Sequence, residues 1–180
     1  MATFDIRIIG DPVLKQVTRP ITDIDGKLAQ LATDMLDTMY AVPGIGLAAP
    51  QVGIQKRLFV YDLHDTPGVL INPEIVESDG EWTYSEGCLS IPGLYFEITR
   101  PDAVLVRGRD LDGNEIELEV DELWGRLMQH ELDHLDGTLM VEHLSDPQRK
   151  AAKKRLRELM LDRTSGPTAV IRADGSVEVD

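Results

Sequence analysis

Two histidines and a glutamate in the second half of the sequence have the spacing of a metal site. Residues 129–134 read Gln-His-Glu-Leu-Asp-His, so His130 and His134 stand four positions apart with Glu131 between them. Residues four apart lie on one face of an α-helix, so both imidazoles could bind one metal ion. Glu131 could then move the proton of a metal-bound water. The alternative is a packed helix whose two histidines hold no metal.

The residues around this motif predict the helix that the metal site needs. Asp121 is a suitable N-cap, and Gly137 stands where a helix would end. Between them, apolar residues recur at helical spacing: Leu123, Leu127, Met128, Leu132 and Leu135.

A catalytic metal site needs at least one further protein ligand, and water should occupy the open position. A third histidine of the H-E-x-x-H-x-x-G-x-x-H pattern is excluded, because Met140 stands at its position. Glu158 is a formal candidate among lysines and arginines, and Glu142 lies very close in sequence to His134. Cys88 is the third source, since one sulfur and two imidazoles form a sound tetrahedral set.

Cys88 has two other interpretations. A lone cysteine is commonly a small buried hydrophobe. It could also be a nucleophile with a histidine as base, although Glu131 would then have no obvious role. We favour the ligand role because residues 86–90 predict a glycine-containing turn next to strands, which could direct a thiolate inward.

Residues 44–53 form a second unusual stretch, Gly-Ile-Gly-Leu-Ala-Ala-Pro-Gln-Val-Gly. The stretch is small and apolar, is interrupted by glycines and a proline, and has Gln51 as its one polar side chain. Such a sequence makes a poor helix and lets the backbone approach another chain or a ligand closely. The alternative is a tight buried connection whose glycines serve packing alone.

Composition limits the class of protein. The 180 residues, 42% of them hydrophobic, suffice for one core and make two domains improbable. No apolar run is long enough to cross a membrane, the N-terminus lacks signal-peptide character, and a single cysteine fits a reducing compartment. The net charge of −14 argues against DNA or other nucleic-acid binding over the whole surface. Residues 146–163 nevertheless carry +4, which leaves −18 elsewhere.

The remaining patterns predict an α+β fold in a single domain, with antiparallel strands around the central metal-binding helix and a further helix near the C-terminus. We assign residues 1–163 to the domain and residues 164–180 to a polar tail, which could carry a short strand at 169–172. Pro73 suggests a sheet edge or a bulge. The predicted helices are 26–42, the metal-binding helix and 146–162, and the predicted strands are 57–63, 69–76, 103–109 and 115–120.

Three motifs, taken together, resemble a known family. Residues 44–51 (GIGLAAPQ), 86–90 (EGCLS) and 129–134 (QHELDH) look like the three signature motifs of the peptide deformylases, in the family's order and at similar spacing. The resemblance extends over nearly the whole folded part. It implies removal of the N-formyl group from the starting methionine of nascent proteins, in the cytoplasm of a bacterium or in an organelle.

The resemblance also implies roles for individual residues. Cys88, His130 and His134 would bind the metal, and Glu131 would be the general acid and base. The side chain of Gln51 and the backbone N–H of Leu89 would form the oxyanion hole, while Ile45, Gly46 and Gly87 would hold the peptide backbone. The family's ion is typically Fe²⁺, with Zn²⁺, Ni²⁺ or Co²⁺ as possible substitutes; ligand types alone would have indicated zinc.

Two features qualify this expectation. The methionine pocket would be formed by Ile45, Leu123 and Leu127, but Arg126 stands where the family often has an apolar residue. Either it turns its charge outward and packs with its stem, or the preference for the substrate's side chain differs. The basic helix over 146–163 is either a solvated face or a docking surface for the ribosome. Outside the deformylases, the alternatives are a metallopeptidase with Glu158 or another carboxylate as third ligand, and a metal-binding or interaction module without activity.

Overall fold

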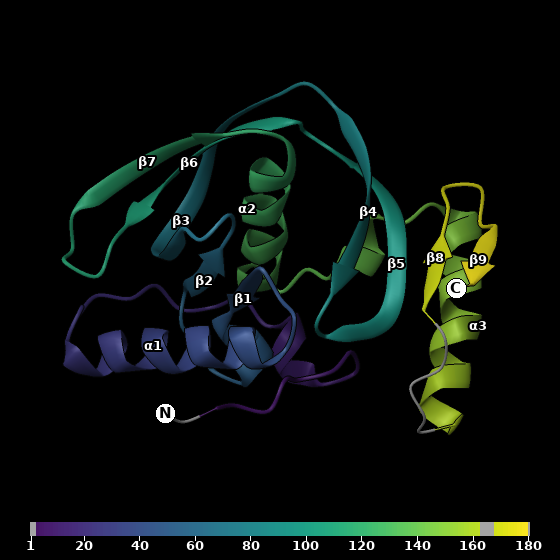
Figure 1. The fold of residues 1–180 in the computed structure, drawn as a ribbon, viewed down its shortest axis with the longest axis horizontal. Helices are drawn as coiled ribbons and strands as arrows, with labels where there is room; N and C mark the ends of the chain where they lie inside the picture. Colours follow the sequence, from purple (N-terminus) through teal and green to yellow (C-terminus); the bar gives the residue numbers. More distant parts are fainter. Residues whose placement is uncertain (1–2, 163–167, 180) are drawn as a thin grey trace.

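The helix that carries His130 and His134 lies between two β-sheets in the computed structural model, which describes residues 3–162 and 168–179 (Figure 1). The predicted α+β class is confirmed. Three α-helices are described: α1 (Gly26–Ala41), α2 (Glu122–Leu135) and α3 (Asp146–Asp162). Three short 3₁₀ turns accompany them: η1 (Pro12–Lys15), η2 (Ala49–Val52) and η3 (Met140–His143).

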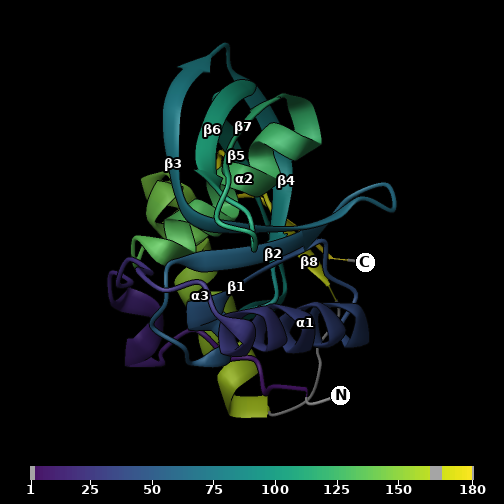
Figure 2. The same ribbon diagram turned by 90° about the vertical axis from the view of Figure 1, so that its left-hand side faces the viewer.

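The first sheet has five strands in the order β1-β2-β3-β6-β7, all antiparallel to their neighbours. Their bounds are β1 (Gly46–Ala48), β2 (Leu58–Asp62), β3 (Pro67–Asp79), β6 (Ala103–Arg109) and β7 (Glu115–Val120). Alternate side chains of β2 point to opposite faces, so Phe59 and Tyr61 pack with α2 while Leu58 and Val60 pack with α1. This sheet is therefore covered by a helix on each face (Figure 2).

The second sheet has four strands in the order β4-β5-β8-β9. They are β4 (Trp82–Cys88), β5 (Ile91–Arg100), β8 (Ala169–Ile171) and β9 (Val177–Val179), with β5 and β8 parallel and the other pairs antiparallel. The predicted turn over 86–90 was too long, because the ladder continues from Trp82 to Cys88 and resumes at Ile91. Only Leu89 and Ser90 form the turn.

Local chemistry explains where the elements begin and break. The Asp25 side chain accepts a hydrogen bond from Leu28 N and caps α1. Asp121 occupies the predicted N-cap of α2, although its side chain makes no capping bond. The predicted irregularity at Pro73 is confirmed as a register shift in β3, next to Asn72 with φ of 51°.

The end of the chain contributes to the core. The strand proposed near 169–172 is confirmed as β8, in which Ala169 and Ile171 are fully buried against β5 and α3. Residues 164–167 and 180 of the predicted tail lie outside the described residues, and the boundary after residue 163 stays a prediction. Among the described helices, none combines the length and the apolar character that a membrane crossing requires.

We expect Ile171→Ala to destabilise the protein by about 2–5 kcal/mol, because it removes buried methyl groups from the third apolar cluster. Val179→Ala, on the half-exposed strand β9, should cost less than about 0.5 kcal/mol. Urea unfolding followed by circular dichroism measures both. A loss as small for Ile171→Ala as the one expected for Val179→Ala would show that β8 does not contribute to the stability of the domain.

Candidate active site and metal centre

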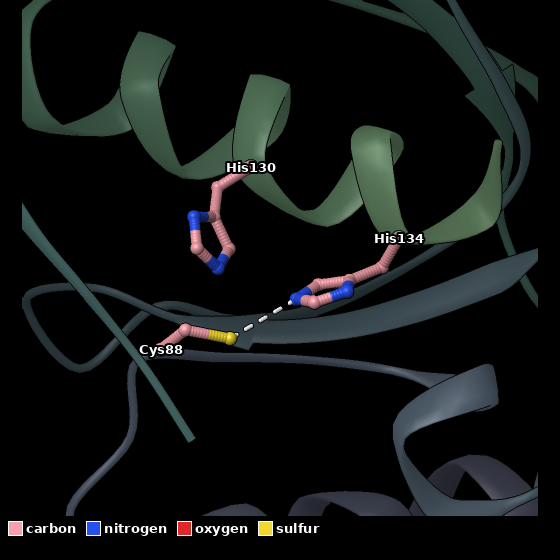
Figure 3. A group of neighbouring side chains, drawn as sticks. All are labelled: Cys88, His130 and His134. Carbon is pink, nitrogen blue, oxygen red and sulfur yellow. Dashed lines mark hydrogen bonds between the residues drawn. The ribbon is translucent and has the colours of Figure 1, made fainter. Parts of the chain in front are cut away.

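Helix α2 presents both histidines on the side that faces the second sheet. His130 and His134 stand one helical turn apart, with ring centroids separated by 5.0 Å and planes inclined by 76°. Figure 3 shows both rings projecting from α2 toward the sulfur of Cys88. The amphipathic pattern of α2 is responsible, because Met128, Leu132 and Leu135 turn toward the five-stranded sheet and leave the other face for the histidines.

Cys88 ends strand β4 and closes the group. Its Sγ lies 3.3 Å from His134 Nε2, and the donor atoms of Cys88, His130 and His134 all lie within 4.8 Å of one another (Figure 3). Donors that share one tetrahedral ion with bonds of about 2.0–2.3 Å stand at comparable separations. Among the described residues, this is the one group of three or more His, Cys, Asp and Glu side chains with such geometry.

The two glutamates considered as alternative ligands have other partners. Glu158 pairs with Arg155 on its own helix at 3.2 Å, and Glu142 binds Lys15 Nζ at 2.5 Å. Burial raises the pKa of Cys88, but the neighbouring histidines outweigh it and lower that pKa well below its ordinary value. The thiolate is the form of cysteine that binds metals, so the residues present fit a divalent ion.

Glu131 is buried beside this group with unused hydrogen-bonding capacity. Its side chain is 3% exposed, and its Oε2 has no partner among the described residues. Burial raises the pKa of Glu131 to about 7, which suits a group that must both accept and release a proton near neutral pH. The backbone of β1 permits this position: a Cβ on Gly46 would stand 2.4 Å from Glu131 Oε1.

Gln51 is fixed with its amide nitrogen toward the sulfur. Its Oε1 accepts a hydrogen bond from Ala48 N at 2.8 Å. Its Nε2 lies 3.2 Å from Ser90 Oγ and 3.7 Å from Cys88 Sγ. Residues 46–52 of this stretch are thus a buried connection, as one interpretation held, and they also deliver a polar group to the site, whereas Ile45 is exposed.

A cleft of about 560 Å³ joins these groups. Its lining includes every substrate-binding and catalytic residue predicted from the sequence and two of the three metal ligands: Ile45, Gly46, Gln51, Gly87, Cys88, Leu89, Leu123, Leu127, His130 and Glu131.

The sequence analysis assigned no role to Glu86, which organises the surroundings of His130. The buried carboxylate lies 3.5 Å from His130 Nδ1 and accepts hydrogen bonds from Arg100 Nε at 2.9 and 3.1 Å. Burial opposes its charge, but these partners prevail and lower the pKa of Glu86 to about 2. Arg100 Nη1 also donates a hydrogen bond to Asp133 Oδ2 at 2.8 Å, and the same carboxylate oxygen contacts His143 Nε2. A charged residue two positions before Cys88, in a motif with no other charge, was the available signal.

Of the two possibilities for Arg126, the outward-turned charge was wrong. Its side chain does not reach solvent: it is 2% exposed and lies over the rings of Trp82 and Tyr84, at 5.1 and 5.8 Å. The buried carboxylate of Glu86, 3.6 Å away, supplies a partner for the charge inside the protein, which the sequence alone did not reveal.

Comparison with known proteins identifies the family. The model of the polypeptide deformylase family matches residues 3–150 of this chain. The chain belongs to this family. A peptide deformylase of Agathobacter rectalis is 55% identical over 142 residues, 79% of this chain and 90% of the relative. One from Hydrogenovibrio crunogenus is 44% identical over 168 residues, 92% of this chain and 99% of the relative.

Solved structures agree with this assignment. The crystal structure of a peptide deformylase from Legionella pneumophila superposes with a TM-score of 0.85 at 38% identity, covering 92% of this chain and 100% of that one. The chain is therefore a metal-dependent hydrolase that removes the N-formyl group from nascent peptides and releases formate.

Gly46→Ala should lower kcat by about 10- to 10²-fold, because the new methyl group would displace Glu131 and Leu127 Cδ1, 2.5 Å away. Gly26→Ala is the matched control, since a Cβ there meets nothing within 4 Å. Formate release by the two variants measures the difference. An unchanged kcat in folded Gly46→Ala would contradict the close approach of β1 to Glu131.

Proposed function

We propose that Cys88, His130 and His134 hold the ion of this deformylase and that Glu131 is its general acid and base. The observation that carries the proposal is the meeting of the three donor atoms within 4.8 Å beside a buried carboxyl group whose pKa is about 7. A divalent ion in this centre supplies Lewis-acid chemistry, because it lowers the pKa of water and polarises a carbonyl oxygen.

The chain's own groups perform the proton transfers. Glu131 accepts the proton of the attacking water at its carboxylate and later gives it to the nitrogen of the leaving peptide. Negative charge develops on the formyl oxygen, where Gln51 Nε2 and the backbone N–H of Leu89 donate hydrogen bonds. Loss of one such donor typically costs about 10²–10³ in rate.

The cleft accounts for the substrate. Ile45, Gly46 and Gly87 hold the peptide backbone, and Ile45, Leu123 and Leu127 enclose the methionine side chain. Gly87 cannot be replaced by a larger residue without a clash, because a Cβ would stand 2.5 Å from the ring of Tyr95. The attacked carbon of a formyl group carries a hydrogen atom where other acyl groups carry an alkyl substituent. A narrow site therefore admits a formyl group and excludes larger acyl groups.

We further propose Fe²⁺ as the natural ion, with Ni²⁺, Co²⁺ or Zn²⁺ as substitutes. The thiolate and the two imidazoles suit all four. The choice of iron rests on the resemblance of the three sequence motifs to the deformylases. The enzyme would act in the cytoplasm of a bacterium or in an organelle, where formylated chains are synthesised.

Helix α3 is the proposed contact with the ribosome. Its exposed residues include Lys150, Lys153 and Lys154, on a chain whose net charge is −14. Arg163 belongs to the same basic stretch but lies outside the described residues. A local positive surface on an acidic protein favours contact with an RNA-rich particle.

Glu131→Gln should lower the rate of formate release from formyl-Met-Ala-Ser by at least about 10²-fold while metal content stays unchanged, because the amide cannot accept the proton. The assay uses anaerobically purified protein whose metals are measured. Glu119→Gln is the control, since the same substitution is then made on the exposed side of β7.

A rate that falls in air and returns with Ni²⁺ would support an oxygen-sensitive iron centre. Metal-loaded wild-type protein that releases no formate would refute the proposed roles. Full activity in Glu131→Gln would refute the role of that residue alone.

Replacing Lys150, Lys153 and Lys154 together by glutamate should abolish co-sedimentation with ribosomes, and binding of the wild type should weaken as salt rises. Lys27→Glu with Lys56→Glu, two exposed lysines outside α3, is the control. Binding that is absent in the wild type, or insensitive to salt, would exclude this docking surface.

A further inference from the structure

The proposed ligands belong to two parts of the fold that need to be held in register. His130 and His134 stand on α2, whose apolar residues pack on the five-stranded sheet. Cys88 belongs to β4 in the other sheet and packs with a separate apolar cluster. A metal site tolerates displacements of only about 0.5 Å, so contacts between α2 and the β4–β5 hairpin must fix the distance.

Arg126 makes several of these contacts. It stands on α2 one turn before His130, and its Nη1 donates a hydrogen bond to the carbonyl oxygen of Ile98 on β5 at 3.1 Å. Its Nη2 donates to the carbonyl oxygen of Trp82 on β4. The guanidinium also lies over the aromatic rings of Trp82 and Tyr84. One buried side chain therefore ties α2 to both strands of the hairpin.

The same guanidinium acts on the carboxylate of Glu86. Arg126 Nη1 lies 3.6 Å from Glu86 Oε2, whereas His130 Nδ1 lies 3.5 Å from Oε1. Arg100 Nε bridges both oxygens, at 2.9 and 3.1 Å. Arg126 is thus a second charge beside Arg100 that faces Oε2, and it approaches the carboxylate from the same helix as His130.

We propose that Arg126 is a positioning residue of the metal centre, which acts through Glu86 on the orientation of His130. Groups that hydrogen-bond to a ligating histidine fix its tautomer and ring orientation. A lysine could keep the charge but could not reach two carbonyl oxygens and the carboxylate at once. The inference rests on the proposed Cys88-His130-His134 centre.

The test is made on Co²⁺-loaded full-length protein, so that binding and geometry are read without turnover. Arg126→Met keeps most of the side-chain volume, and we expect about 10- to 100-fold weaker Co²⁺ affinity, measured by competition with a chromophoric chelator. The visible absorption of the bound Co²⁺ should also change. Arg126→Lys should restore only part of the Co²⁺ affinity and part of the absorption. Arg107 is an exposed, ion-paired arginine, and Arg107→Met should change neither the affinity nor the absorption.

A double-mutant cycle with Glu86→Gln tests the route of the effect. If Arg126 acts through Glu86, Arg126→Met should weaken Co²⁺ binding much less in the Glu86→Gln background than in the wild type. If the fold-losses of Co²⁺ affinity in Arg126→Met and Glu86→Gln multiply in the double variant, the proposal is overturned. Wild-type affinity and absorption in Arg126→Met would also overturn it. Should Arg126→Met fail to fold, wild-type affinity and absorption in folded Arg126→Lys would overturn it.

Failure of the proposed centre gives a different result. Wild-type protein that binds no Co²⁺, or Cys88→Ser protein whose Co²⁺ absorption matches the wild type, would refute the ligand set itself. Normal thiolate absorption in the wild type together with unchanged Arg126 variants would refute only the positioning role.

Discussion

The buried carboxylate of Glu86 is the interaction on which the geometry of the site depends. A charge in the protein interior is tolerated only when partners replace the water it has lost, and removing one partner typically costs about 3–5 kcal/mol. Glu86 has Arg100, Arg126 and His130 around it. These partners come from β5 and α2, while Glu86 itself belongs to β4. Satisfying one buried charge therefore brings the strand of Cys88 and the helix of both histidines into a fixed relation.

Apolar packing places α2, and the polar network of Glu86, Arg100 and Asp133 orients the side chains of the site. The five-stranded sheet and the two helices that cover it bury most of the large side chains and place α2. Packing of this kind is insensitive to direction and cannot orient an imidazole ring. The hydrogen bonds of Glu86, Arg100 and Asp133 are directional, and they lie where α2 meets the second sheet. Asp133 extends the network to His143 in η3, at the end of α2 remote from Arg126.

Of the proposed reacting groups, Glu131 is left incompletely satisfied: it is buried with one oxygen unpartnered among the described residues. A fold optimised for stability alone would pair such an oxygen, so its state is typical of a functional site. Gln51 has its carbonyl oxygen bound by the backbone, and its amide nitrogen is directed to Ser90 and Cys88. The absence of a side chain at Gly46 leaves the space that Glu131 occupies.

The sequence by itself determined the local elements and the chemistry of the site. Helical periodicity and the i, i+4 histidines predicted α2, and the strands predicted over 103–109 and 115–120 have the observed bounds of β6 and β7. Spacing could not choose between Cys88 and Glu158, since both are remote in sequence from His130; the resemblance favoured Cys88, and the fold brings Cys88 to the histidines. Only the tertiary structure decided the position of Arg126 and the role of Glu86. The energy of a buried charge depends on partners that come from other strands and helices, and no local pattern contains that information.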